Sequence, residues 1–162
     1  MAVCEYASPL GNMLLASENG MLAGAWFENA KYYASGLNDD CVDPNDPILI
    51  QTIRWLDAYF EARRPDPHAL PIRLSGSEFR QAVLRLLLEI PYGRTVTYGQ
   101  LAARLAEQTG RRVSAQAVGG AVGHNPISVV IPCHRVLGAD GSLTGYAGGL
   151  ERKQALLQLE ML

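Results

Sequence analysis

Residues 128–136 read Ser-Val-Val-Ile-Pro-Cys-His-Arg-Val, and the rest of the chain is organised around them. The apolar, β-branched start of this stretch predicts a short buried strand. Because Pro132 fixes its own φ and biases the residue before it toward extended geometry, we expect the thiol of Cys133 at the end of that strand. His134 and Arg135 follow, and such neighbours lower the pKa of a thiol from its free value of about 8.5. The alternative is a half-buried structural cysteine, but the segments on both sides favour a nucleophile.

Two further motifs flank this stretch, Asn125-Pro126 upstream and Gly-Tyr-Ala-Gly-Gly at residues 145–149 downstream. With Pro-Cys-His-Arg-Val at residues 132–136 between them, they resemble the O6-alkylguanine-DNA alkyltransferases in order and spacing. The resemblance covers the last half of the chain densely and the first half only in length and rough pattern. It implies a single-turnover repair enzyme that moves the alkyl group from O6-alkylguanine, and from O4-alkylthymine, in double-stranded DNA to its own cysteine.

The resemblance implies roles for four catalytic residues. Cys133 takes the alkyl group by displacement, with guanine as the leaving group. His134 accepts the thiol proton through a water molecule, and Glu160 orients and charge-balances that imidazole in a Cys-His-Glu relay. Asn125 holds the turn between a recognition helix and the stretch that carries the cysteine.

The resemblance also implies a set of residues that contact DNA or the alkylated base. Such a base lies inside the duplex, so the nucleotide must rotate out before a thiolate can reach it. Tyr98 would donate to the base and crowd its 3′ phosphate, Tyr146 would form an aromatic pocket wall, and Arg135 would tie segments of the protein together. The backbone at two further positions would read the guanine edge. The full set is Tyr98, Ser114, Ala115, Gln116, Arg135, Tyr146, Ala147 and Gly148.

Gln116 departs from the family pattern, because many relatives carry an arginine there that replaces the extruded base in the stack. Glutamine still fills space and hydrogen-bonds the orphaned base, but it lacks the stacking cation. Arg111 and Arg112 lie close in sequence and restore some charge. We therefore expect weaker or less damage-selective base flipping rather than a different reaction.

Length and composition set the outer limits of the fold. A chain of 162 residues with 48% hydrophobic and 19% charged residues holds one domain, or two small ones that share an interface. No apolar run is as long as a membrane span, and the first residues lack the pattern of a signal peptide. Three cysteines, Cys4, Cys41 and Cys133, suit a reducing compartment. We expect a cytoplasmic monomer.

The charge is divided unevenly along the chain. Residues 1–78 carry 5 Lys/Arg against 11 Asp/Glu, a balance of −6, whereas residues 79–162 carry 9 against 5, a balance of +4. Chance scatter is one explanation. The other is that the basic half meets phosphate, which this asymmetry favours.

The first half predicts a small structural α+β domain over residues 1–76. Three alternating runs, one pair of them joined by Asn19-Gly20, indicate an antiparallel meander. Residues 28–46, which include Asp39, are polar and predict a loop. Asp46-Pro47 then predicts a helix start, and Pro65 and Pro67 its stop. The strands are expected at Val3–Ser8, Met13–Ser17 and Met21–Phe27, and the apolar helix face at Leu49, Ile53, Leu56 and Phe60.

The second half, residues 77–162, predicts a mostly helical, winged-helix or helix-turn-helix-like DNA-binding domain after a linker at residues 71–78. Phe79 to Ile90 form one amphipathic pattern, and Thr97-x-x-Gln100 is a capping box that opens a second helix. Ser114 caps a third helix, residues 115–122, whose small side chains allow close approach to another surface. Residues 150–162 predict a final helix. The fold class is therefore α+β.

No cofactor or metal is expected. The chain contains neither GxGxxG nor a P-loop, and Cys4 and Cys41 lack the spacing of metal ligands. Some relatives bind a structural zinc near the N-terminus, but its histidine partners are not found in this sequence. A thioether formed on Cys133 has no readily displaced leaving group, so we expect the protein to act once and stay alkylated.

Three other functions compete with alkyl transfer. A helix-turn-helix regulator would use Cys133 as an alkylation or redox sensor. A non-catalytic binder of alkylated DNA would lack the cysteine, which this chain keeps. A cysteine hydrolase would need an oxyanion arrangement and would turn over many times.

Overall fold

The computed structural model describes residues 1–37 and 40–162 and begins with a meander of three antiparallel strands. They are β1 (Ala2–Ser8), β2 (Gly11–Glu18) and β3 (Met21–Phe27). Asn19 and Gly20 both have positive φ, as the tight turn between two right-twisted strands requires. The predicted meander is therefore confirmed.

A fourth strand corrects part of the predicted loop over residues 28–46. β4 (Cys41–Val42) pairs in parallel with β1 at the sheet edge, so the strand order is β3-β2-β1-β4. Its two residues were hidden from a periodicity argument because two residues are too few to show alternation. Asp39, which was placed in that loop, lies outside the described residues.

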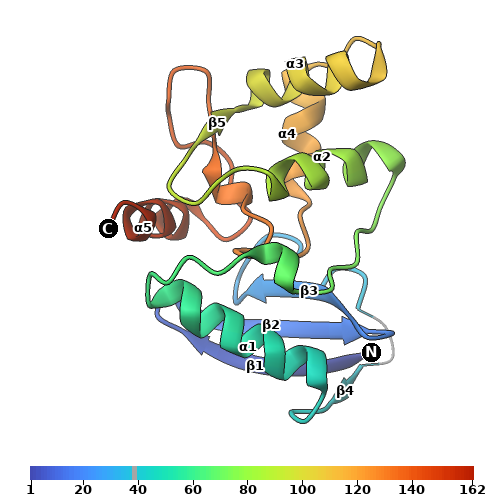
Figure 1. Cartoon of the computed structure of the whole chain (residues 1–162), viewed down its shortest axis with the longest axis vertical. Helices are drawn as coiled ribbons and strands as arrows, with labels where there is room; N and C mark the ends of the chain where they lie inside the picture. The colour runs from blue at the N-terminus through green and yellow to red at the C-terminus, as the bar shows by residue number, and fades with distance from the viewer. Residues whose placement is uncertain (38–39) are drawn as a thin grey trace.

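Helix α1 (Pro47–Phe60) crosses one face of the sheet (Figure 1). The Asp46 side chain accepts hydrogen bonds from the backbone N–H groups of Ile48 and Leu49, which confirms the predicted cap. The helix ends at Phe60, five residues before the proline that was expected to stop it. The face it buries is Leu49, Thr52, Trp55, Leu56 and Tyr59. The predicted face was therefore right at Leu49 and Leu56, whereas Ile53 and Phe60 are only partly buried.

The connection to the second half is partly built into the sheet. After a short 3₁₀ turn, η1 (Pro67–Ala69), the Pro71 carbonyl accepts a hydrogen bond from Leu22 and the Arg73 N–H donates to the Leu22 carbonyl. The predicted linker at residues 71–78 is therefore wrong for its first residues, which pair with β3. Local composition gave no sign of this pairing, because the partner lies about fifty residues earlier.

The second half contains four helices among the described residues, and the caps predicted at Thr97 and Ser114 are confirmed, whereas Ser77, expected in the linker, proves to be a further cap. The helices are α2 (Glu78–Leu88), α3 (Tyr98–Thr109), α4 (Ala115–Gly123) and α5 (Leu150–Glu160). Ser77 and Ser114 cap α2 and α4, and Thr97 forms the full capping box with Gln100. Two short parallel strands, β5 (Val96–Thr97) and β6 (Val136–Leu137), join the segments before α3 and after the cysteine.

The stretch over residues 128–136 corrects the prediction of a strand. Ile127, just before the stretch, makes an isolated bridge to Ala25 of β3, the chain then turns through Val129 at φ +71°, and strand pairing resumes only at Val136, the first residue of β6. Cys133 opens a 3₁₀ turn, η2 (Cys133–Arg135). The run is apolar because it is buried, not because it is extended. Local backbone bonds such as Ile131 N–H to the Ile127 carbonyl satisfy its polar groups instead of a sheet ladder.

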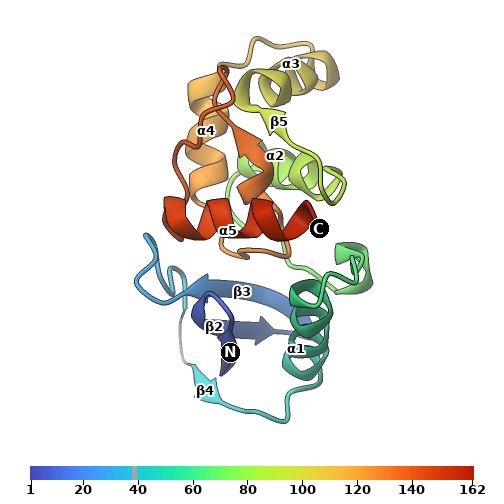
Figure 2. The ribbon, with the colours of Figure 1, turned by 90° about the vertical axis from the view of Figure 1, so that its left-hand side faces the viewer.

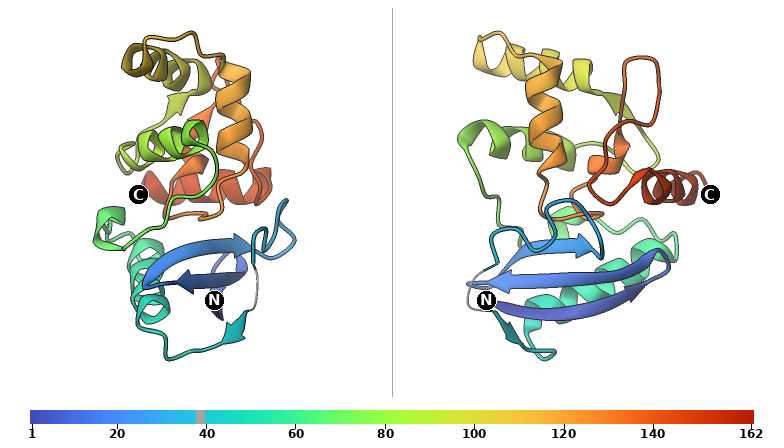
Figure 3. Two further views of the ribbon diagram at one scale, coloured as in Figure 1. Left: turned by 90° about the vertical axis from the view of Figure 1, so that its right-hand side faces the viewer. Right: turned by 180° about the vertical axis from the view of Figure 1, so that it is seen from behind.

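The two halves share one hydrophobic core. The cluster of buried side chains runs from Leu15 and Phe27 of the sheet, through Leu56 of α1, to Val122 of α4 and Leu156 of α5. Figure 2 shows α5 lying between the sheet and the other helices of the second half. In the view from behind, α4 stands upright in the upper half of the molecule, above the sheet (Figure 3, right). The observed architecture confirms the predicted α+β fold class.

Among the described residues, no helix combines the length and the apolar character needed to cross a lipid bilayer.

Candidate active site

Cys133 lies at the start of η2 with only 4% of its surface exposed. The side chain of Asn125, just after α4, holds it there. The Asn125 carboxamide oxygen accepts from the Ile127 N–H, while its Nδ2 donates to the Ile131 carbonyl at 2.9 Å and to Cys133 Sγ at 3.1 Å. One amide thus links the end of α4, the turn and the sulfur. The sequence placed Asn125 at this turn, and the structure adds its direct bond to the thiol.

The resting thiol is protonated. Burial raises the pKa of the Cys133 thiol to about 11, and the Asn125 hydrogen bond and the Lys153 charge offset only part of that effect. A thiol is far less nucleophilic than its thiolate, so a base has to remove the proton before the sulfur can react at neutral pH.

His134 and Glu160 form a buried pair beside the thiol. Nε2 of His134, whose side chain is fully buried, lies 2.5 Å from Oε2 of Glu160. Burial alone would raise the pKa of the Glu160 carboxyl, but the hydrogen bonds and charges of His134 and Arg135 bring it to about 2. Burial lowers the pKa of His134, and the hydrogen bond and charge of Glu160 offset only part of that effect. The pair is therefore a neutral imidazole that donates its Nε2 proton to a carboxylate.

That protonation state leaves Nδ1 of His134 as the acceptor. Nδ1 is buried and has no hydrogen-bond partner among the described residues. A buried polar atom without a partner is costly, and such atoms concentrate at sites where a water molecule or a substrate binds. The imidazole is thus able to accept a proton on the side away from Glu160.

Arg135 lies inside the protein rather than on a surface that DNA could reach. Its Nε donates to Oε1 of Glu160 at 2.7 Å, and Nη1 donates to the Ile90 carbonyl at 2.7 Å. The backbone N–H of Gly93 donates to the same carboxylate at 3.1 Å. Arg135 therefore ties the loop after α2 to the end of α5, which matches its expected structural part rather than a contact with substrate.

The glycine-rich segment after β6 forms a wall near the cysteine. The Tyr98 hydroxyl, from the first turn of α3, donates to the Thr144 carbonyl at 3.2 Å. The ring of Tyr146 packs over Gly148, where a Cβ would come within 2.7 Å of that ring, so only glycine fits. The Ala147 carbonyl accepts from the backbone N–H of Lys31 at 2.8 Å. The Tyr98 hydroxyl also lies 3.5 Å from the Gly145 carbonyl, so the structure brings Tyr98 and the 145–149 segment together.

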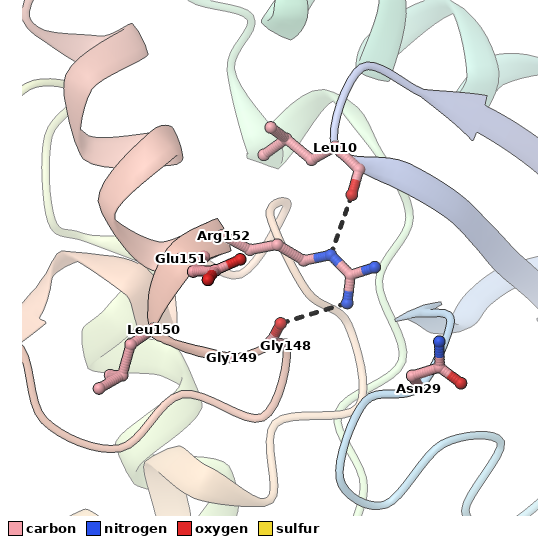
Figure 4. A pocket seen from close by; sticks show the side chains of 7 residues that line it. All are labelled: Leu10, Asn29, Gly148, Gly149, Leu150, Glu151 and Arg152. Atoms are coloured by element: carbon pink, nitrogen blue, oxygen red, sulfur yellow. Dashed lines mark hydrogen bonds between the residues drawn. The ribbon is translucent and has the colours of Figure 1, made fainter.

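A surface hollow of about 570 Å³ adjoins this segment but contains none of the relay residues (Figure 4). Arg152 crosses it, donating to the Leu10 and Gly148 carbonyls, and also to the Glu28 carbonyl. Its guanidinium lies 4.8 Å from the Phe27 ring centroid. One arginine of α5 therefore fastens the glycine-rich segment to the strand ends of the first half.

Helix α4 presents an open face. Val118, Ala121 and Val122 are buried against the core, as predicted for the valines. The opposite face is exposed and bears little side-chain bulk. It consists of Ser114, Ala115, Gln116, Ala117 and Gly120, with Arg111 and Arg112 exposed in the turn before it.

Two residues at the site escaped the sequence prediction. Lys153 of α5 is fully buried, and its Nζ donates to the Val136 and Thr144 carbonyls at 2.6 and 2.8 Å. Its spacing from Leu156 and Glu160 on one helix face could have predicted its burial. Tyr59 of α1 donates to Glu160 at 2.5 Å across 101 positions of sequence, and no local pattern predicts that.

Among the described residues, no group of three or more His, Cys, Asp or Glu side chains is placed to hold a metal ion.

A thiol held by an amide, beside a histidine–glutamate pair and below an exposed helix of a helix-turn-helix, defines a DNA-binding protein with a cysteine available for covalent chemistry. The model of the 6-O-methylguanine DNA methyltransferase DNA-binding domain matches residues 78–162, and that of the ribonuclease-like domain of the same family matches residues 4–74. The chain belongs to the 6-O-methylguanine DNA methyltransferase family.

Individual relatives agree with the family models. A methylated-DNA–protein-cysteine methyltransferase of Mycobacterium leprae is 40% identical over 153 residues, which is 94% of this chain and 88% of that one. The corresponding protein of Haemophilus influenzae is 40% identical over 158 residues, covering 97% and 84%. The crystal structure of Mycobacterium tuberculosis OGT in complex with DNA superposes with a TM-score of 0.85 at 38% identity, covering 99% of this chain and 92% of that one.

Proposed function

We propose that Cys133 is the residue to which this DNA-repair methyltransferase transfers the alkyl group of O6-alkylguanine. The protein is a direct-reversal repair enzyme acting on alkylated double-stranded DNA, as its family and relatives are. The observation that carries the assignment to Cys133 is its 3.1 Å bond to Asn125 beside the buried His134–Glu160 pair. Nothing in the relatives supports the alternative of a helix-turn-helix regulator.

The geometry supports a reaction with a defined path for the proton. Nδ1 of His134 accepts the thiol proton through a water molecule, while Glu160 stabilises the imidazolium that forms. The sulfur then attacks the alkyl carbon, the bond from carbon to O6 breaks, and its electron pair stays on guanine. The base takes up one proton and becomes ordinary guanine. The net change is an S-alkylcysteine in exchange for a thiol, with no co-reactant.

The product explains why each molecule acts once. A thioether is not cleaved by water or by thiols under ordinary conditions, so Cys133 is consumed. The reaction calls for no cofactor, because the base itself is the leaving group.

The nearly buried position of Cys133 supports base flipping. The sulfur of a residue that is only 4% exposed cannot reach an O6 atom that remains inside a duplex, so the nucleotide must leave the stack. Gln116, on the exposed face of α4, would fill the space that the base leaves in the DNA stack, and Ser114 and Ala115 would contact the DNA backbone. Tyr98, Tyr146 and the backbone at Ala147 and Gly148 would then surround the base. O4-alkylthymine presents a similar alkyl oxygen and is proposed as a second substrate.

The chain is proposed to divide after residue 76 into a structural module, residues 1–76, and an alkyl-acceptor module, residues 77–162. The two family models match residues 4–74 and 78–162, which supports this boundary. A cytoplasmic location is proposed from the free thiols of Cys4, Cys41 and Cys133, since free thiols persist in reducing compartments.

The test is to incubate the protein with a duplex oligonucleotide bearing O6-methylguanine, digest it and look for one added methyl group. We expect the methyl on the Cys133 peptide, in an amount equal to the active protein and without steady-state turnover. Cys133→Ala should abolish repair, whereas Cys41→Ala, which removes an exposed thiol, should leave it unchanged. Repair that survives in Cys133→Ala would overturn the assignment.

A further inference from the structure

Tyr59 of α1 connects the first half of the chain to the histidine–glutamate pair. Only 1% of its surface is exposed, and its hydroxyl donates to Oε2 of Glu160 at 2.5 Å. The same hydroxyl lies 3.4 Å from Nε2 of His134, and the two rings meet edge to face with centroids 6.3 Å apart. A residue of the module described above as structural therefore touches both members of the pair.

The oxygen that Tyr59 contacts is the one that receives the imidazole proton. Oε2 of Glu160 accepts from His134 at 2.5 Å, from Tyr59 at 2.5 Å and from Nη2 of Arg135 at 3.1 Å. Oε1 is engaged separately, by Gly93 and by Nε of Arg135. Because Arg135 already neutralises the carboxylate, the hydroxyl is not needed to balance its charge. Its effect falls on the direction and strength of the bond to His134.

Packing alone does not account for the hydroxyl. The Tyr59 ring contacts Trp55, Phe60 and Tyr92, and a phenylalanine ring would make the same contacts. Burying a hydroxyl is favourable only where it finds a strong acceptor. Burial and the Glu160 charge both raise the pKa of Tyr59, so it stays a neutral donor throughout the physiological range.

We propose that Tyr59 is a positioning residue for alkyl transfer, through which the N-terminal module sets the orientation and basicity of His134. The proposal rests on the proposed function of Cys133 and His134 and adds to it a part for residues 1–76. Together with Nη2 of Arg135, the hydroxyl limits the directions from which the imidazole can donate to Oε2. It also weakens the carboxylate as a proton acceptor, which keeps His134 neutral and ready to act as a base.

The direction of the effect follows from the charges that face the pair. Burial lowers the pKa of His134 most, Glu160 raises it, and the charges of Arg135 and Lys153 lower it further. Cys133, Tyr92 and Tyr146 also face this region and are neutral at physiological pH. Removing the Tyr59 hydroxyl strengthens the hold of Glu160 on an imidazolium, so the pKa of His134 rises. The base is then lost at a higher pH as the solution is acidified.

The test compares Tyr59→Phe with the unchanged protein in single-turnover methyl transfer from about pH 5 to about pH 9. We expect the acid limb of the pH–rate profile to shift to higher pH by roughly half a pH unit. The rate on that limb should fall several-fold, and the affinity for DNA should not change. Tyr6→Phe is the matched control, because Tyr6 also donates to a carboxylate of α1, Asp57, at 2.7 Å. It should lower stability comparably without moving the profile.

A second measurement separates this inference from the proposed function. The pKa of His134, followed by NMR in protein labelled at histidine, should be higher in Tyr59→Phe whether or not methyl transfer occurs. Replacing Tyr59 with 3-fluorotyrosine keeps the ring and strengthens the donor, so the acid limb should move the opposite way. A Tyr59→Phe profile that superposes on that of Tyr6→Phe, with an unchanged His134 pKa, would overturn the proposal. Failure of the unchanged protein to methylate Cys133 would instead overturn the proposed function.

Discussion

The sulfur of Cys133 lies in surroundings that favour the thiol, which suits an acceptor that is used once. A thiol pKa of about 11 leaves little thiolate at neutral pH. The residue therefore reacts slowly with electrophiles or oxidants unless His134 removes the thiol proton. Asn125 and Lys153 lower that pKa without cancelling the effect of burial. Together with the neutral His134, they allow the thiolate to form when the reaction proceeds.

Among the residues that the structure describes, Lys153 is the cationic side chain whose charge lowers the pKa of Cys133. In Lys153→Met the chain keeps its length but loses the charge and the donors to the Val136 and Thr144 carbonyls. We expect methyl transfer to slow by about tenfold or more, because the pKa of the Cys133 thiol rises and less thiolate forms. The free energy of unfolding should fall by about 2 kcal/mol from the two buried carbonyls left without their donor.

Single-turnover rates measure the first part of this prediction, and denaturant unfolding measures the second. Lys31→Met is the control, since Lys31 is the exposed lysine of the chain and its side chain contacts Tyr32. Equal rates in the two variants would show that the Lys153 charge does not act on the sulfur.

At the scale of elements, the sequence predicts whatever is encoded locally. Asp46, Thr97 and Ser114 are caps whose bonds run to residues two or three positions ahead, so the sequence alone predicts these helix starts. Ser77 caps α2 in the same way, but the sequence analysis assigns it to the linker. Residues 128–136 were misread as a strand, because apolar, β-branched character reports burial and not the partner of the backbone. Their turns are held by the Asn125 side chain, a contact that composition does not reveal.

Helix α4 carries a prediction of its own, at Gln116. In Gln116→Arg the exposed face of the helix gains a cation beside Arg111 and Arg112. An arginine can stack on the neighbouring bases and attract phosphate, so affinity for duplex DNA containing O6-methylguanine should rise by about tenfold. The methyl-transfer rate at saturating DNA should change little, because Gln116 is remote from the sulfur in the proposed arrangement.

Fluorescence anisotropy with damaged and undamaged duplexes measures this effect. Gln154→Arg adds the same charge on an exposed position of α5 and should have a smaller influence. Unchanged affinity in Gln116→Arg would count against placing this helix face on DNA.

At the scale of the whole molecule, the site depends on contacts that no stretch of sequence contains. The cysteine, the histidine and the glutamate were predictable because family motifs mark them. Tyr59 and Arg152 were not, since their partners are 101 and 142 positions away, at Glu160 and Leu10. Both residues join the first half of the chain to the second half. The sequence predicts a structural part for residues 1–76, and the structure adds contacts from these residues to Glu160 and to Arg152.

Arg152 allows that joint to be tested without touching the relay. Its guanidinium donates to the Leu10, Glu28 and Gly148 carbonyls and covers the Phe27 ring. In Arg152→Ala we expect a loss of about 2 kcal/mol in the free energy of unfolding and a fall of about 5 °C in Tm. Because the glycine-rich segment is then held less firmly, methyl transfer should also slow several-fold.

Arg104→Ala is the control, since Arg104 makes one exposed ion pair, to Glu89, and should change neither quantity appreciably. Lower stability with an unchanged rate would show that Arg152 joins the modules without shaping the pocket, and an unchanged Tm would show that the joint does not depend on it.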